Sequence, residues 1–204
     1  PIRYEPYDDV ILFRTVAGEF GVRVQAFIST LKVAVPRTLD LGFCPTGEVT
    51  TRTIKVRNVG QKTATFSWKH GPPFQLSPLT GTIEPGKHCN ITVSFDPTDA
   101  TVFVASAVCT VPGHEPLLMK MSAIGKYPFI SSSDTHLDFE DVLTDIPSKM
   151  VQKEFELRNQ SLVRATYKIV AVEQDHDPVY RFSPTTGVID PESHIMVKVQ
   201  YFPK

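Results

Sequence analysis

The stretch LSPLTGTIEPGKHCNITVSFDPT, residues 76–98, indicates the fold because a second version of it follows 106 residues later. That version, FSPTTGVIDPESHIMVKVQYFPK, occupies residues 182–204. Apolar and polar residues alternate through the second half of each copy, which predicts a strand with one face in a core. The inward residues are Cys89, Ile91, Val93 and Phe95 in the first copy and Ile195, Val197, Val199 and Tyr201 in the second. Pro97 and Pro203 end both strands at one register, because proline cannot extend a ladder.

The turns that precede these two strands also correspond. Ser77–Gly81 matches Ser183–Gly187. We expect the proline to fix φ at the start of each turn, and Gly81 and Gly187 to take a positive φ at its end.

A second pair of turns follows immediately. The order Pro85-Gly86 is typical of a type II turn, in which the third residue needs a positive φ. The later copy has Pro191-Glu192 and lacks the glycine. It therefore predicts a type I turn.

The correspondence extends upstream at an offset of 101 residues. The matched residues are Ile54, Val56 and Asn58 with Phe155, Leu157 and Asn159, and Ala64, Phe66 and Trp68 with Ala165, Tyr167 and Ile169. Trp68 is the largest predicted core residue. Asn58 and Asn159 stand at strand ends, where we expect the amide to bond the local backbone.

A third, partial copy begins the chain. Its matches are Tyr4–Pro6 with Phe95–Pro97, Val10–Phe13 with Thr101–Val104, and Phe20, Val22, Val24 and Ala26 with Leu117, Met119, Met121 and Ala123. We therefore expect an array: residues 1–29 form the last two strands of one unit, 30–126 a complete unit, and 127–204 a unit that stops before its last two strands. The start at Pro1 indicates a piece of a larger protein.

Each full unit contains about seven short strands with turn signals every 8–12 residues, which is typical of an antiparallel β-sandwich. No segment has a sustained helical period. The fold class predicted is therefore all-β, built from tandem sandwiches. The linkers 26–36 and 123–130 are short and apolar, so neighbouring units should keep a fairly fixed relation.

Composition excludes several classes of partner. The formal net charge is −1, whereas nucleic acid and acidic membrane surfaces attract an excess of Lys and Arg. The apolar runs are far shorter than the roughly 20 residues that span a bilayer. Three cysteines without paired spacing favour a reducing compartment.

Candidates for catalysis and metal binding are few. No His or Cys pair has the spacing of a zinc site, and we expect no cofactor. Cys89 faces the core as an inert thiol, and Cys44-Pro45 is predicted in a loop without a partner base. Asp175–Asp177 (DHD) is a loop cluster that we interpret as a polar tip. An enzyme is the weakest hypothesis.

Two sequons, Asn90-Ile91-Thr92 and Asn159-Gln160-Ser161, leave a secreted adhesion module open. If they carry glycans, the chain is extracellular. Asn159 also matches Asn58, which is in no sequon. A structural role for that asparagine is the competing interpretation.

The joint order of Arg57-Asn58, Ser77-Pro78, Gly81, Pro85-Gly86 and Phe95-Asp96-Pro97 resembles the ASH branch of the major-sperm-protein superfamily, named after ASPM, centrosomal proteins and hydin. The resemblance covers nearly the whole chain. It implies immunoglobulin-like sandwiches without a disulfide, and a scaffold of the cilium or flagellum axoneme rather than an enzyme. Implied partners are axonemal or microtubule-associated proteins, with no small-molecule substrate. A centrosome or basal-body recruitment module is the alternative.

One superfamily branch binds acidic peptides through a basic face. Lys55, Arg57 and Lys69 alternate with inward residues and are the candidates for such a patch here. Contact through strand edges and grooves between units is the interpretation we favour, because backbone pairing requires no particular side chains.

Overall fold

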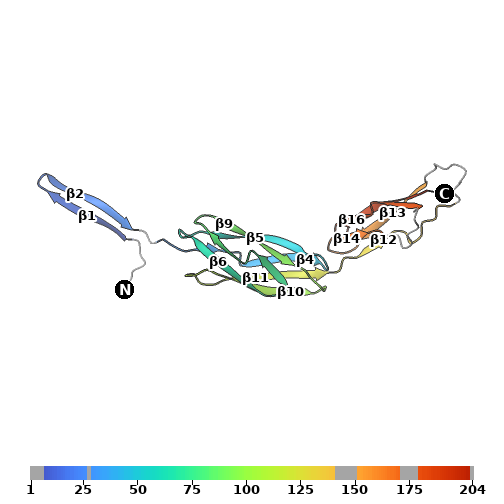
Figure 1. Ribbon diagram of the computed structural model, residues 1–204, viewed down its shortest axis with the longest axis horizontal. Helices are drawn as coiled ribbons and strands as arrows, with labels where there is room; N and C mark the ends of the chain where they lie inside the picture. The colour runs from blue at the N-terminus through green and yellow to red at the C-terminus, as the bar shows by residue number, and fades with distance from the viewer. Residues whose placement is uncertain (1–6, 27–28, 141–150, 171–178, 203–204) are drawn as a thin grey trace.

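The structure is a computed structural model that describes residues 7–26, 29–140, 151–170 and 179–202. Every regular secondary-structure element in these ranges is a β-strand, so the all-β prediction is confirmed. Figure 1 shows an amino-terminal hairpin, a central unit and a C-terminal unit in chain order. The hairpin consists of β1 (Tyr7–Thr15) and β2 (Gly18–Ala26).

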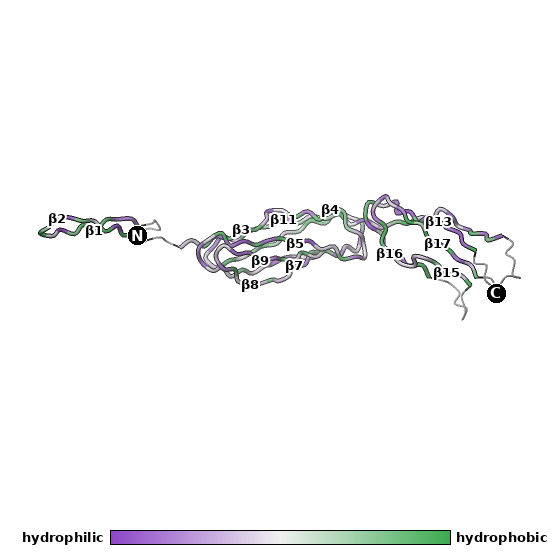
Figure 2. The backbone as a smooth tube through the Cα atoms, turned by 90° about the horizontal axis from the view of Figure 1, so that it is seen from above, coloured by the Kyte–Doolittle hydropathy of each residue, from purple (hydrophilic) through white to green (hydrophobic). Residues whose placement is uncertain are grey.

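The central unit is a sandwich of two sheets. Its strands are β3 (Val33–Ala34), β4 (Thr38–Pro45), β5 (Thr50–Asn58), β6 (Ala64–His70), β7 (Phe74–Ser77), β8 (Thr80–Ile83), β9 (His88–Phe95), β10 (Val102–Thr110) and β11 (Leu117–Lys126). One sheet has the order β4-β11-β10-β6-β8 and the other β3-β5-β9-β7. Hydrophobic and hydrophilic residues alternate along these strands (Figure 2), as a two-layer core requires.

The core lies between the two sheets. Trp68 is 4% exposed and Phe95 is fully buried. The rings of Phe74 and Phe95 stack with centroids 4.9 Å apart. The other large core side chains expected from the repeat pattern are also buried: Ile54, Val56, Phe66, Ile91 and Val93.

The central unit departs from the expected antiparallel sandwich of about seven strands in two ways. It has nine strands, because the chain passes from one sheet to the other at Pro36 and again at Pro78, with a strand on each side of each proline. In addition, β4 runs parallel to β11, with Thr38 opposite Lys120. Proline has no N–H to donate to a neighbouring strand. It therefore lies at the point where the chain leaves one sheet and joins the other.

The C-terminal unit repeats one sheet of the central unit. Its strands are β12 (Ile130–Ser132), β13 (Val151–Asn159), β14 (Ala165–Lys168), β15 (Tyr180–Ser183), β16 (Thr186–Ile189) and β17 (His194–Tyr201). The order β12-β13-β17-β15 corresponds to β3-β5-β9-β7, and β14-β16 corresponds to β6-β8. The described residues contain no counterparts of β10 and β11.

Leu137–Glu140 correspond in the sequence repeat to Leu39–Gly42 of β4, and they show the effect of that difference. In β4, the Gly42 N–H donates to Asp40 Oδ1 at 3.0 Å. The Glu140 N–H donates to Asp138 Oδ1 at 2.9 Å in the same local turn. Residues 137–140 nevertheless form no strand. The reason is that β4 pairs only with β11, and no counterpart of β11 is described.

Gly81 and Gly187 do not end a turn with positive φ, so that expectation is wrong. Each lies inside a strand, directly opposite Phe66 and Tyr167, respectively. A Cβ at either glycine would come within 2.8 Å of the facing ring. The glycines therefore make room for an aromatic ring that lies across the strand.

The prediction of a type I turn before β17 is also wrong. Gly86 has a φ of 74°, as a type II turn requires, and Glu192 has nearly the same φ of 56°. The Asn159 N–H donates to the Ser193 carbonyl at 2.9 Å, which fixes the end of the turn against β13. Tertiary bonding thus imposes the left-handed conformation on a residue that does not favour it.

The hairpin register corrects one proposed match. Phe13 pairs with Phe20, and Cys109 pairs with Leu117. If Phe20 corresponds to Leu117, then Phe13 corresponds to Cys109 and not to Val104. The paired residues lie seven positions apart in the hairpin and eight apart in the central unit, so the proposed match at Val104 is displaced by five positions.

Candidate interaction surfaces

A buried asparagine organises the loop after β5. The Asn58 Nδ2 donates to the carbonyls of Lys62 at 2.7 Å and Ile83 at 2.8 Å. Its Oδ1 accepts from the Gly60 N–H at 3.0 Å. One side chain therefore ties together the end of β5, the loop after it and the end of β8.

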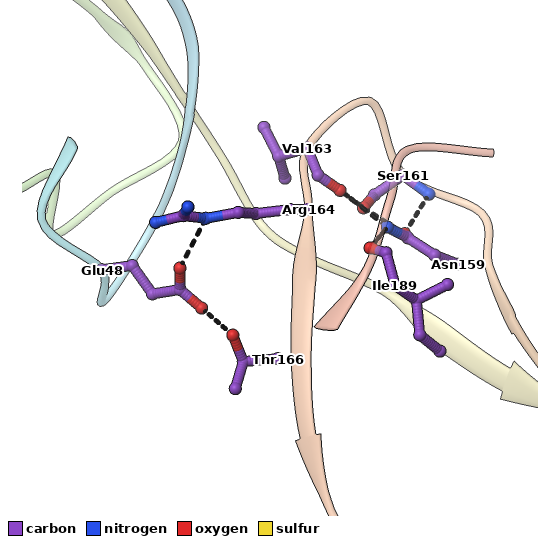
Figure 3. Close-up of polar contacts among 7 residues, drawn as sticks. All are labelled: Glu48, Asn159, Ser161, Val163, Arg164, Thr166 and Ile189. Carbon is purple, nitrogen blue, oxygen red and sulfur yellow. Dashed lines mark hydrogen bonds and ion pairs between the residues drawn. The ribbon is translucent and has the colours of Figure 1, made fainter. Parts of the chain in front are cut away.

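Asn159 does the same for the loop after β13 (Figure 3). Its Nδ2 donates to the carbonyls of Val163 at 2.7 Å and Ile189 at 2.9 Å, and its Oδ1 accepts from the Ser161 N–H at 2.9 Å. Asn159 is 0% exposed. A buried amide that makes these bonds is not available to a glycan in the folded chain, so this sequon gives the secreted hypothesis no support.

The loop between β4 and β5 projects Glu48 from the end of the central unit. The Thr46 N–H donates to the Lys126 carbonyl at 2.9 Å, and the Gly47 N–H donates to the Pro97 carbonyl at 3.1 Å. Gly47 has a φ of 74°, which suits glycine. The backbone on the amino-terminal side of Glu48 is therefore fixed to its own unit.

Glu48 binds two side chains of the C-terminal unit (Figure 3). Its Oε2 accepts from Arg164 Nε at 3.0 Å, and its Oε1 accepts from the Thr166 hydroxyl. The side chains of Glu48 and Arg164 are 26% and 52% exposed. Each carboxylate oxygen thus has its own partner across the junction between the units.

An open hollow of about 330 Å³ lies beside this contact. Its lining includes Leu41, Pro45 and Val49 from the central unit and Leu162 and Pro191 from the C-terminal unit. Thr50, Arg52 and Arg164 also line it. The two units therefore meet at a partly filled junction of mixed polarity, and Glu48 and Arg164 form its ion pair.

The linker between the units is held at both ends. Lys126 accepts the hydrogen bond from Thr46, and the Phe129 carbonyl accepts one from the Gln160 N–H at 3.0 Å. The Tyr127 hydroxyl donates to Asp99 at 2.7 Å. Only Tyr127 and Pro128 separate the two anchored residues, which agrees with the stiff linker expected from its sequence.

The three predicted basic residues do not form one patch. Lys55 and Arg57 lie on the outer face of β5 in the four-stranded sheet, whereas Lys69 belongs to β6 in the opposite sheet. Alternation identifies the outward positions of a strand but does not identify its sheet. Lys55 and Arg57 instead line a hollow with Lys87 and His88.

The cysteines provide no activated nucleophile. Cys44 belongs to β4 and is buried, so its predicted loop position is wrong. Burial raises the pKa of the Cys44 thiol and raises that of Cys109 to about 11. Cys89 is half-buried beside the core. Thiols with raised pKa values are poor nucleophiles at neutral pH.

The described residues contain no group of three or more His, Cys, Asp or Glu side chains placed to hold a metal ion. The Asp175–Asp177 cluster lies outside the described residues. Within the same ranges there is also no helix long and apolar enough to cross a bilayer.

The sequence patterns did not indicate Glu48, Arg164 or Thr166. The repeat pattern consists of the residues that the units share, whereas Arg164 has a different counterpart in the central unit. At the offset of 101, Arg164 corresponds to Thr63. The signal that could have identified the contact is this replacement of a neutral Thr63 in the central unit by a charged Arg164 at the same loop end of the C-terminal unit.

The fold defines a class: a chain of immunoglobulin-like β-sandwich units joined by a short anchored linker. Residues 32–123 match the family model described as "HYDIN/CFA65/VesB-like, Ig-like domain". The match spans nearly the whole central unit, and it agrees with the resemblance to hydin-like sandwiches expected from the sequence.

The full chain is similar to longer proteins. It is 31% identical over 205 residues to cilia- and flagella-associated protein 65 of Chlamydomonas reinhardtii, covering 100% of this chain and 10% of that protein. It is 24% identical to the human hydrocephalus-inducing protein homolog, covering 87% of this chain and 3% of that protein. The chain thus spans a tenth or less of these two relatives.

The comparison with solved structures gives a partial alignment. The ASH/PapD-like domain 7 of human CEP192 aligns with a TM-score of 0.41 and 13% identity, over 48% of this chain and 85% of that one.

Proposed function

We propose that this chain is a non-enzymatic structural segment of a cilium- or flagellum-associated protein. It mediates protein–protein contacts in the axoneme, with the central apparatus as the candidate location, and supports ciliary or sperm motility or assembly. The family model that the central unit matches and the names of the relatives that match along the chain support this proposal.

The observation that carries the proposal is the construction of the junction between the units. The linker is anchored on both sides, and a side-chain contact crosses the junction directly. A connector with those features transmits position from one unit to the next, unlike a flexible tether. Holding partners at fixed spacing is the function that such a connector serves best.

The central unit has strand edges to which a partner protein can bind. Strands β3 and β7 border one sheet of the central unit, and β8 borders the other. An extended segment of another protein can pair with such an edge through main-chain hydrogen bonds. The proposed partners are axonemal or microtubule-associated proteins. The formal charge of −1 is unfavourable for nucleic acid or an anionic membrane.

The test is proximity labelling with the full-length parent protein in ciliated cells, combined with imaging of the endogenous protein. We expect signal along the axoneme shaft and biotinylated axonemal neighbours. A freely diffusing ligase in the same cells is the control. Signal confined to the basal body or spindle pole would replace the proposal with a recruitment module. Glycosidase-sensitive mass on Asn90, which is exposed on β9, would replace it with a secreted one.

A further inference from the structure

We propose that the contact of Glu48 with Arg164 and Thr166 is a charge-dependent latch that sets the angle between the central and C-terminal units. The name latch refers to these three residues only. The role of a fixed angle in a cell depends on the proposed scaffold function, whereas the angle itself is a property of the isolated chain.

The two sides of the latch are presented by ordered backbone. On one side, hydrogen bonds from residues 46 and 47 hold the loop of Glu48 against the end of its own unit. On the other, Asn159 binds the Val163 carbonyl, directly before Arg164. Little backbone has to be ordered when the side chains meet, so forming the contact costs little conformational entropy.

The surroundings leave the angle to be decided by this contact. The hollow beside it is open, so apolar packing does not fill the junction. A solvent-exposed ion pair contributes little stability by itself. Here the short linker keeps the partners at a high effective concentration, so a weak pair is enough to favour one angle. The two residues between the anchored linker positions are where the alternative angles arise.

The cation of the latch on the C-terminal unit, Arg164, differs from its counterpart in the central unit. The central-unit counterparts of Arg164 and Thr166 are Thr63 and Thr65. The Thr65 hydroxyl lies 3.4 Å from that of Thr82, within its own unit. At the position of Arg164 the central unit therefore has a neutral side chain, with the exposed Lys62 beside it in the loop. We infer that the angle between neighbouring units differs from one junction to the next, because the loop ends that contact each other differ between repeats.

The test is a double electron–electron resonance measurement of the distance between spin labels on the two units. Labels are attached at Lys69→Cys on β6 and Met196→Cys on β17. The half-buried native thiol is removed by Cys89→Ala, and the buried thiols of Cys44 and Cys109 remain. The complete chain is used, because neither unit has been shown to fold alone.

We expect one narrow distance peak in the parent, and loss of that peak in Glu48→Arg and in Arg164→Glu. The charge-swapped double variant Glu48→Arg/Arg164→Glu should recover the peak. Salt of about 1 M, where the Debye length is ~3 Å, should broaden the distance peak of the parent chain and leave the distance distribution of Glu48→Arg unchanged.

Glu84→Arg is the matched control, because Glu84 is an exposed glutamate of a turn in the same unit, and it should keep the narrow peak. Unchanged fluorescence of Trp68 would show that the central unit remains folded in each variant. An unaltered peak in both single variants would overturn the latch. A peak lost in both and not recovered by the swap would also overturn it. Neither result bears on where the parent protein resides.

Discussion

The central and C-terminal units are built from nearly the same pattern, but within the described residues their sheets face different numbers of strands. The sheet β12-β13-β17-β15 repeats the order of β3-β5-β9-β7, whereas five strands face it in the central unit and two in the C-terminal unit. Phe66 is 1% exposed, and its counterpart Tyr167 is half-buried. The alternation of apolar residues therefore predicts where a strand lies. The strands of the facing sheet determine how much free energy the burial of its side chains contributes.

The largest expected difference between the units concerns Trp68 and its counterpart Ile169. Trp68→Ala should destabilise the central unit by about 3–5 kcal/mol, because it empties a closed core. Ile169 is only half-buried, so Ile169→Ala should cost the C-terminal unit much less. Chemical denaturation followed by circular dichroism measures both.

Trp68→Phe is the matched control. The indole Nε1 has no hydrogen-bond partner among the described residues, so this change should lose volume but no hydrogen bond. Equal costs for Trp68→Ala and Ile169→Ala would break the comparison, since they would imply a C-terminal core as closed as the central one.

The second prediction concerns what the two units share. Asn58→Ala and Asn159→Ala should each destabilise their own unit by about 2–3 kcal/mol, because buried backbone carbonyls lose their donors. Trp68 fluorescence reports the central unit, since Trp68 is the only tryptophan. Hydrogen exchange of β17 amides reports the C-terminal unit. Asn90→Ala, at an exposed position, is the control. Loss of protection in both units from one substitution would contradict the separate roles.

A smaller effect should distinguish the turns before β9 and β17. Glu192→Gly should stabilise the C-terminal unit by about 0.5–1 kcal/mol, because glycine adopts the positive φ without strain. Gly86→Ala should shift the central unit in the opposite direction by a similar amount. Hydrogen exchange and Trp68 fluorescence provide the two readouts. If Glu192→Gly destabilises its unit, the conformation is not strained as we infer.

The smallest effect is expected from pH near 9. Burial raises the pKa of Cys109 to about 11 from an ordinary 9.0. Below pH 9 the thiol is protonated in both states and stability is unaffected. Between pH 9 and 11 the unfolded thiol ionises first, so the central unit loses stability. The C-terminal unit has no cysteine and lacks this contribution. Cys109→Ala should flatten the pH profile of Trp68 unfolding, and an unchanged profile would contradict the assignment.

Local pattern predicted most of the fold. Period-two alternation located the strands, and paired prolines and asparagines located their ends. It did not predict the crossings at Pro36 and Pro78, because the choice of sheet depends on distant partners. The left-handed Glu192 and the strand positions of Gly81 and Gly187 likewise result from tertiary contacts that override local preference.

The candidate site was less accessible to sequence reasoning for the same reason. Alternation correctly turned Lys55, Arg57 and Lys69 outward but could not show that two sheets separate them. The contact of Glu48 with Arg164 joins residues 116 positions apart. Both stand in loops, where no periodicity indicates direction.

The parallel pairing of β4 with β11 has a consequence for biosynthesis. Thr38 meets Lys120, so the partner of β4 leaves the ribosome about eighty residues after it. At about 5–20 residues per second the nascent chain waits several seconds with one strand unmatched. Because β11 is the last strand of its unit, β12 follows it from the ribosome within a few residues. Translation speed and chaperone access thus become part of how such a protein avoids pairing strands between neighbours.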